Sequence, residues 1–121
     1  MQQQWDNQRP IYEQLAEQLV TAILDGRLAA GDPIPSVRQL AGELQVNPLT
    51  VQRAISQLAD QGIVERRRGV GSFVAQQAQM QLRKQARDNF VSHTWPQILE
   101  QIRRLELDTA PLIAQMENLD G

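Results

Sequence analysis

The 121-residue sequence contains no cysteine and a single histidine, His93. The absence of cysteine excludes disulfide bonds and thiolate catalysis, and it argues against a zinc finger. A lone histidine without neighbouring ligands argues against a histidine-based metal site. Aromatic residues make up only 4% of the chain, but hydrophobic residues make up 41%, which is enough to support a packed core.

Long apolar runs are also missing. No stretch approaches the length that crosses a membrane, and Met1-Gln2-Gln3-Gln4-Trp5 has neither the basic start nor the apolar run of a signal peptide. The sequence therefore predicts a cytoplasmic protein with no membrane partner. It shows no nucleophile–base pair, no phosphate-cradling glycine loop and no cluster of metal ligands, so we expect neither an enzyme nor a cofactor.

Basic residues are concentrated rather than numerous. The formal net charge is −2, which taken alone disfavours a nucleic-acid partner. However, Arg38, Arg53 and Arg66-Arg67-Arg68 fall within one predicted motif, whereas many acidic residues lie outside it. Such segregation of charge can give an acidic protein a basic face.

The chain divides into three parts. Residues 1–9 are polar and glutamine-rich, so we expect a flexible N-terminus. Residues 10–75 have the pattern of one compact domain, and residues 76–121 have a helical pattern that forms a small appendage.

Apolar residues at helical spacing predict three helices in the compact domain. The first runs from Pro10 to a C-cap at Asp25-Gly26, where glycine tolerates the left-handed backbone. Ser36 begins the second helix, and Gln39 three residues later completes a capping box. The third covers 48–61 and has the position of a recognition helix.

A short turn joins the second and third helices. Gln45-Val46 forms this turn, Asn47 caps the third helix and Pro48 takes its first position. The third helix turns Val51, Ala54, Ile55 and Leu58 toward the core and leaves outside Gln52, Arg53, Ser56 and Gln57. Two capped helices joined in this way also occur in plain helical domains, so the pair alone is only a moderate signal.

A basic hairpin follows the third helix. Residues 63–66 and 72–75 have strand character, and Arg67-Arg68-Gly69-Val70-Gly71 between them allows a sharp turn. The predicted fold class is therefore mostly α with a small β-hairpin: a winged helix-turn-helix. This fold offers DNA a helix for the major groove and a basic loop, the wing 66–71, for the backbone or minor groove.

The C-terminal part predicts short helices. Ser92-His93-Thr94 interrupts the first of them, Thr94 is a good N-cap for the next with Gln97 completing a capping box, and Asp108 or Thr109 caps the last. Whether these helices are continuous or broken near Thr94-Pro96 is left open by the pattern.

A narrow apolar seam runs along these helices, because Trp95, Ile98, Ile102 and Leu105 step by three and four residues. Helices this short bury such a seam most easily against a second copy, although packing onto the same chain's winged domain is an alternative. The predicted dimerisation residues are Leu82, Phe90, Trp95, Ile98, Ile102, Leu105, Leu112 and Met116.

The compact domain closely resembles the DNA-binding domain of GntR-type bacterial transcription regulators. The resemblance is carried by Pro35-Ser36-Val37-Arg38-Gln39-Leu40-Ala41 and by the stretches 46–54 and 62–74. Only 46 residues follow Ala75. With this short C-terminal part, the chain resembles the short-tailed YtrA subfamily, whose C-terminal helices imply a dimer. Gln45 stands where the family often has glycine, and it is destabilising by about 1 kcal/mol if the backbone there is left-handed.

The first turns of a recognition helix enter the major groove. We therefore expect Arg53 to bind a guanine edge, Gln52 an adenine edge and Leu49 a thymine methyl. Serine, threonine and arginine side chains nearby are suited to phosphates, although Arg38 has an alternative in an ion pair with Glu43. The predicted DNA-binding residues are Ser36, Arg38, Asn47, Leu49, Thr50, Gln52, Arg53, Arg67, Arg68 and Gly69.

These expectations combine into a sequence-specific transcription regulator, more simply a repressor than an activator. It would bind an inverted-repeat, double-stranded operator as a homodimer. The alternative is a winged helix that serves as a protein-interaction module without a specific DNA target. A small-molecule effector in a cleft at the dimer interface near Trp95 stays open, and the sequence names no candidate.

Overall fold

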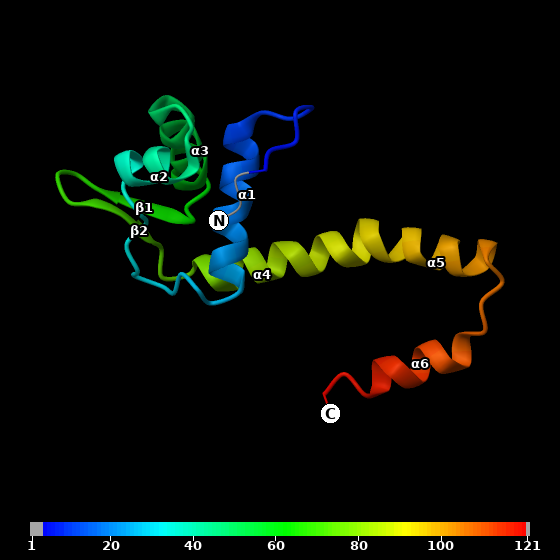
Figure 1. Ribbon diagram of the computed structural model, residues 1–121. Coiled ribbons are helices and arrows are strands. Elements are labelled where there is room, and N and C mark those ends of the chain that lie inside the picture. The colour runs from blue at the N-terminus through cyan, green and yellow to red at the C-terminus, as the bar shows by residue number, and fades with distance from the viewer. Residues whose placement is uncertain (1–3, 121) are drawn as a thin grey trace. The chain divides into compact units, whose positions relative to one another are not determined.

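The structure is a computed structural model that describes residues 4–120 (Figure 1). These residues form six α-helices, one π-helical segment and a two-stranded antiparallel hairpin, which confirms the predicted fold class. The chain divides between Lys84 and Gln85 into two compact units.

Three helices build the core of the first unit: α1 (Ile11–Leu24), α2 (Val37–Leu44) and α3 (Pro48–Asp60). Both α1 and α2 pack against α3, because each helix carries one apolar face. The largest fully buried side chains in these helices are aliphatic: Leu15, Leu19, Ile23, Leu40, Val51 and Leu58.

Side-chain caps begin both α2 and α3. Ser36 Oγ accepts a hydrogen bond from the Gln39 N–H at 3.0 Å, and Asn47 Oδ1 caps α3 in the same way at 2.9 Å. Both predicted N-caps are confirmed, but the second half of the capping box is not formed, because the Gln39 side chain donates to Glu43 instead, at 3.2 Å. Gln45 ends α2 with φ 55°, so the left-handed residue is present.

The hairpin consists of β1 (Val64–Arg67) and β2 (Gly71–Val74), with the first residue of β1 opposite the last of β2. Each strand is shifted by one residue toward the turn relative to the prediction. Gly69, with φ 76°, lets the chain reverse over three residues rather than five. A bridge from Pro33 to Phe73 lies along the other edge of β2.

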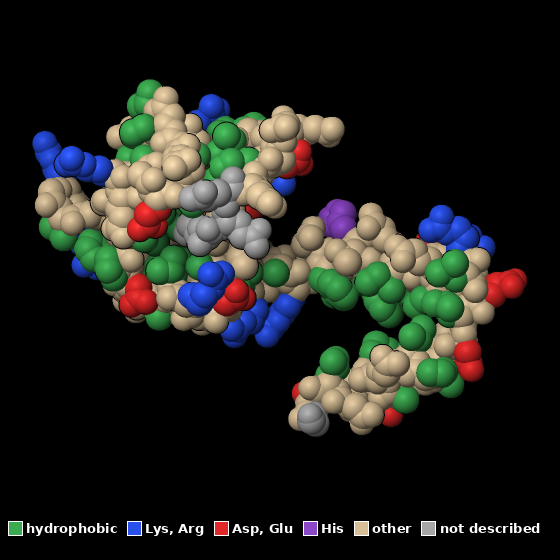
Figure 2. Space-filling view, in the orientation of Figure 1, with side chains coloured by type: hydrophobic (Ala, Val, Ile, Leu, Met, Phe, Trp, Pro, Cys, Tyr) green, Lys and Arg blue, Asp and Glu red, His purple; other side chains and the backbone are tan. Residues whose placement is uncertain are grey.

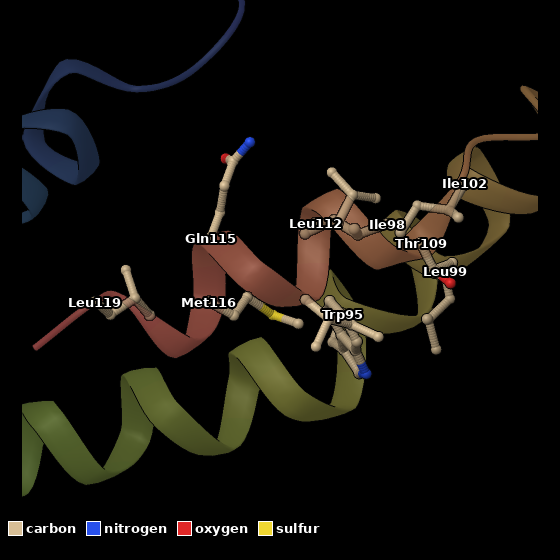
Figure 3. A pocket seen from close by; sticks show the side chains of 10 residues that line it. Trp95, Ile98, Leu99, Ile102, Thr109, Leu112, Gln115, Met116 and Leu119 are labelled. Atoms are coloured by element: carbon tan, nitrogen blue, oxygen red, sulfur yellow. The ribbon is translucent and has the colours of Figure 1, made fainter.

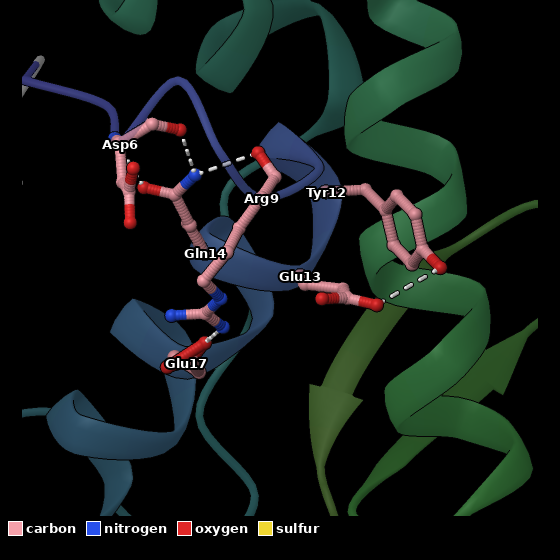
Figure 4. Close-up of polar contacts among 6 residues, drawn as sticks. All are labelled: Asp6, Arg9, Tyr12, Glu13, Gln14 and Glu17. Atoms are coloured by element: carbon pink, nitrogen blue, oxygen red, sulfur yellow. Dashed lines mark hydrogen bonds and ion pairs between the residues drawn. The ribbon is translucent and has the colours of Figure 1, made fainter.

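The segment before α1 makes specific contacts with that helix (Figure 4). Gln14 accepts a hydrogen bond from the Asp6 N–H at 2.8 Å and donates to the carbonyls of Asp6 and Arg9 at 2.8 and 3.0 Å. Trp5 packs against the core. Of the segment 1–9 that the sequence predicts to be flexible, residues 1–3 lie outside the described residues.

The helix α4 (Ala78–Asn89) begins in the first unit. Its first-turn residue Ala78 is buried, and Leu82, four residues later on the same face, is only 5% exposed within the core. The structure therefore corrects the assignment of Leu82 to the dimerisation seam, because this side chain already packs within its own chain.

The π-helical segment η1 (Phe90–Thr94) and α5 (Trp95–Arg104) follow α4 without a loop. The predicted N-cap at Thr94 is wrong, because its backbone is helical and its side chain makes no capping hydrogen bond. Pro96 lacks an N–H, and its ring would clash with the carbonyl four residues earlier in a regular helix. A π turn, with the Trp95 N–H bonded to the Phe90 carbonyl, accommodates the proline, so the helix continues.

The last helix, α6 (Thr109–Glu117), is capped by Asp108, whose Oδ1 accepts the Ala110 N–H at 3.1 Å. This settles the choice between Asp108 and Thr109. None of the described residues of the second unit, 85–120, is buried. The second unit therefore leaves its apolar side chains without an internal core.

Candidate nucleic-acid interface

The outer face of α3 carries the side chains predicted to read bases. Leu49, Gln52 and Arg53 are exposed and Thr50 is half-buried, whereas the opposite face of the helix lies in the core. Leu49 is 69% exposed. The Asn47 cap fixes the start of α3, so all four side chains fall within its first two turns.

Arg53 lies against an aromatic ring on another helix. Its Cζ is 4.0 Å from the centroid of the Tyr12 ring on α1. Tyr12 packs against the core, and its hydroxyl donates to Glu13 Oε1 at 3.4 Å. Both stacked residues line a hollow of about 310 Å³ together with Ile11, Leu49 and Thr50. No motif in the sequence marks Tyr12 as a site residue, because its helical spacing is already explained by packing.

Hydrogen-bond donors surround the start of α2 and α3. The oxygens of Ser36 and Asn47 are used as caps, but the Ser36 hydroxyl hydrogen and the Asn47 amide hydrogens stay available to a phosphate. Arg38 is exposed and forms no ion pair with Glu43 or any other of residues 4–120. These groups have the chemistry of backbone contacts.

The three consecutive arginines of the hairpin have different surroundings. Arg66 donates to Ser56 Oγ on α3, so it ties the hairpin to that helix. Arg67 lies 4.2 Å from the Phe73 ring centroid and pairs with Glu65 at 3.3 Å. Arg68 forms no hydrogen bond or ion pair with the residues that the structure describes, and it sits in the turn beside Gly69.

The hairpin tip lies next to the start of α2. Val70 and Gly71 line a hollow of about 240 Å³ together with Ser36 and Val37. Figure 2 shows basic side chains gathered at the hairpin tip. The structure thus brings Ser36 beside the wing and connects the wing to α3 through Arg66.

Apolar side chains of α5 and α6 line a groove of about 520 Å³ in the second unit (Figure 3). Five residues of the predicted dimerisation set are among those that line it: Trp95, Ile98, Ile102, Leu112 and Met116. Phe90 and Leu105 lie outside the groove and are 46% and 66% exposed.

Other kinds of site find no support in the described part of the chain. No group of three or more His, Asp or Glu side chains among residues 4–120 is placed to hold a metal ion. Within the same residues, no helix has both the length and the apolar character needed to cross a membrane.

Residues 11–74 match the family described as bacterial regulatory proteins, gntR family. Two relatives come from Bacillus subtilis (strain 168). The HTH-type transcriptional repressor YtrA is 34% identical over 110 residues, which cover 91% of this chain and 78% of YtrA. The uncharacterized HTH-type transcriptional regulator YhcF is 42% identical over 80 residues, which cover 66% of each chain. Both relatives are named as transcription regulators and not as enzymes.

Two solved structures are similar to this chain. A GntR family transcriptional regulator from Listeria monocytogenes has a TM-score of 0.74 at 29% identity, covering 95% of this chain and 99% of that one. The AraR(DBD), solved in complex with operator ORR3, has a TM-score of 0.51 at 31% identity and covers 53% of this chain and 77% of its own. The first resembles nearly the whole chain, and the second resembles about half of it.

Proposed function

Because this chain belongs to the gntR family of bacterial regulatory proteins and is a DNA-binding transcription regulator, we propose that it binds an inverted-repeat operator as a homodimer and represses transcription. The observation that carries the proposal is the exposed face of α3, with Gln52 and Arg53 in its first two turns, beside a hairpin whose tip carries Arg68, which has no ion-pair partner among residues 4–120. The protein would act in the cytoplasm, where the operator is.

Base readout falls to α3 in this proposal. Arg53 binds a guanine edge through its two-pronged guanidinium, Gln52 binds an adenine edge, and Leu49 contacts a thymine methyl. The exposure of all three side chains supports these roles. We expect Arg53→Ala to reduce the preference for the operator over unrelated DNA by about 5- to 150-fold for each half-site, the value of one good bidentate contact.

Phosphate contacts position the protein and come from the groups around α3. Ser36, Arg38, Asn47 and Thr50 supply donors at the helix starts, and the wing supplies Arg67, Arg68 and the Gly69 N–H. The neighbourhood of Ser36 and the hairpin tip supports one continuous backbone contact.

The second unit joins two copies of the chain. Its described residues bury no side chain of their own, and a 520 Å³ groove lined by Trp95, Ile98 and Ile102 is open. Packing of this groove against a second copy removes its apolar surface from water. A two-fold dimer presents two α3 helices to DNA, so the operator is expected to be an inverted repeat.

Repression is the simplest outcome of this binding, because a dimer on a promoter excludes the polymerase. The relative YtrA is named a repressor, which supports the same sign of regulation.

Binding-site selection tests the proposal. The full chain would be incubated with a random duplex library at about 150 mM salt, and the bound fraction sequenced. Enrichment of an inverted repeat with half-sites about one helical turn apart is the expected result. Weak, salt-sensitive retention of DNA without an enriched motif would instead favour a protein-interaction module.

A further inference from the structure

We propose that Tyr12 is a positioning residue for base readout: its ring holds the Arg53 guanidinium in a fixed orientation on the exposed face of α3. The inference rests on the proposed function, because Arg53 needs an operator base to read. Its basis is the stack of Arg53 Cζ at 4.0 Å from the Tyr12 ring centroid, which joins an exposed side chain of α3 to a half-buried one of α1.

A parallel stack on the ring leaves the reading edge of an arginine free. A guanidinium that lies over a ring uses its face, whereas its N–H donors point outward in its plane. Arg53 forms no ion pair with any of residues 4–120, so no acidic side chain in this part of the chain competes for those donors. The ring therefore restrains the side chain without occupying the atoms that bind guanine.

The ring itself is well anchored. Tyr12 packs against the hydrophobic core, and this packing holds the ring in place. An unrestrained arginine loses rotamer freedom when it binds a base. The stack restricts the Arg53 rotamers before DNA binds, so less side-chain entropy is lost on binding. Removal of the ring should therefore weaken operator binding without changing the contacts that DNA makes elsewhere.

The test compares Tyr12→Leu, which removes the aromatic face but keeps apolar bulk, with Tyr12→Phe, which keeps the ring and loses the hydroxyl. Two duplexes serve as probes: the one that the wild-type chain enriches most strongly from a random library, and a scrambled duplex of the same composition. We expect Tyr12→Leu to weaken operator binding about 3- to 10-fold. For Tyr12→Leu, binding to the scrambled duplex and the melting temperature should stay near wild type. For Tyr12→Phe, operator binding should stay near wild type as well.

A double-mutant cycle shows whether Tyr12 acts through Arg53. The variant Tyr12→Leu/Arg53→Ala should bind the operator no more weakly than Arg53→Ala alone, and Tyr12→Leu should relax preference at the same base pair as Arg53→Ala. If the losses in operator binding of the two single variants multiply in the double variant, the inference is overturned. A loss in Tyr12→Phe as large as that in Tyr12→Leu would also overturn it, because it would assign the role to the hydroxyl.

The outcomes separate this inference from the proposed function. If wild type selects an operator and Arg53→Ala weakens binding to it while Tyr12→Leu does not, only the role of Tyr12 fails. If Arg53→Ala leaves operator preference unchanged, base readout by Arg53 and positioning by Tyr12 fail together.

Discussion

The three arginines of the hairpin should contribute unequally to the salt dependence of DNA binding. Arg68 has no partner among residues 4–120, whereas Arg66 donates to Ser56 Oγ on α3. An arginine that neutralises a phosphate releases counterions, and each such contact adds about 0.9 to the slope of log K against log salt. Arg68→Ala should therefore lower the slope by about 0.9 for each protomer, or about 1.8 for a dimer.

The consequence for affinity can be worked out. A rise from about 50 to 200 mM salt is about 0.6 logarithmic units, so a slope difference of about 1.8 corresponds to roughly one decade. Over this range the wild-type protein should lose about 10-fold more affinity than Arg68→Ala loses. The loss should be similar for the selected operator and for a scrambled duplex, because phosphates carry no sequence information.

Fluorescence anisotropy with both duplexes at four or more salt concentrations would measure these slopes. Arg66→Ala is the matched control, since it removes the same charge from the same hairpin at a residue that is held on α3. Equal reductions in slope for the two variants would show that the hairpin acts only as diffuse positive charge. An unchanged slope in Arg68→Ala would refute the contact between the wing tip and a phosphate.

Further predictions concern assembly and stability. Ile102→Ala removes three carbons from a groove residue that is already half-buried, so the dimer can bury only the remaining half of them. At about 0.8 kcal/mol per buried carbon this is about 1.2 kcal/mol per copy, or about 2.4 kcal/mol for two copies, so the dimer Kd should rise about 50-fold. Analytical ultracentrifugation would check this, and a Kd no higher than that of Val91→Ala would contradict it. Gln45→Gly should raise the free energy of unfolding by about 1 kcal/mol, because φ is 55° there; a decrease in urea denaturation would oppose this. Asn47→Ala should lower the free energy of unfolding by about 1 kcal/mol by removing the α3 cap, and an unchanged urea midpoint would contradict that role.

Local chemistry explains which parts of the fold could be predicted from the sequence. Ser36 and Asn47 cap helices through hydrogen bonds that reach only two or three residues along the chain, so their signals lie within one short window. Proline and glycine restrict or permit backbone angles by themselves. The three helices, the turn and the hairpin therefore follow from short patterns.

The sequence-based predictions failed where the structure of a residue depends on distant residues or on a competing local interaction. Thr94 has the side chain of a good N-cap, but a π turn accommodates Pro96 and the helix continues through Thr94. Leu82 has the spacing of an exposed seam, but the core of the first unit covers it. The stack of Tyr12 on Arg53 joins two helices, and no spacing within either helix predicts such a contact. Tertiary packing set the outcomes at Leu82 and Tyr12, whereas the backbone requirement of Pro96 set the outcome at Thr94.

The net charge of −2 does not weaken the DNA-binding interpretation, because acidic and basic residues are unevenly distributed along the chain. Within residues 4–120, ion pairs hold Arg9, Arg27, Arg67 and Arg103. Arg38, Arg53 and Arg68 have no acidic partner in that range, and the first turns of α2 and α3 contain no acidic residue. At physiological salt, charges separated by more than about 8 Å of solvent are largely screened. A phosphate at this surface therefore responds to the local arginines rather than to the total charge of the chain.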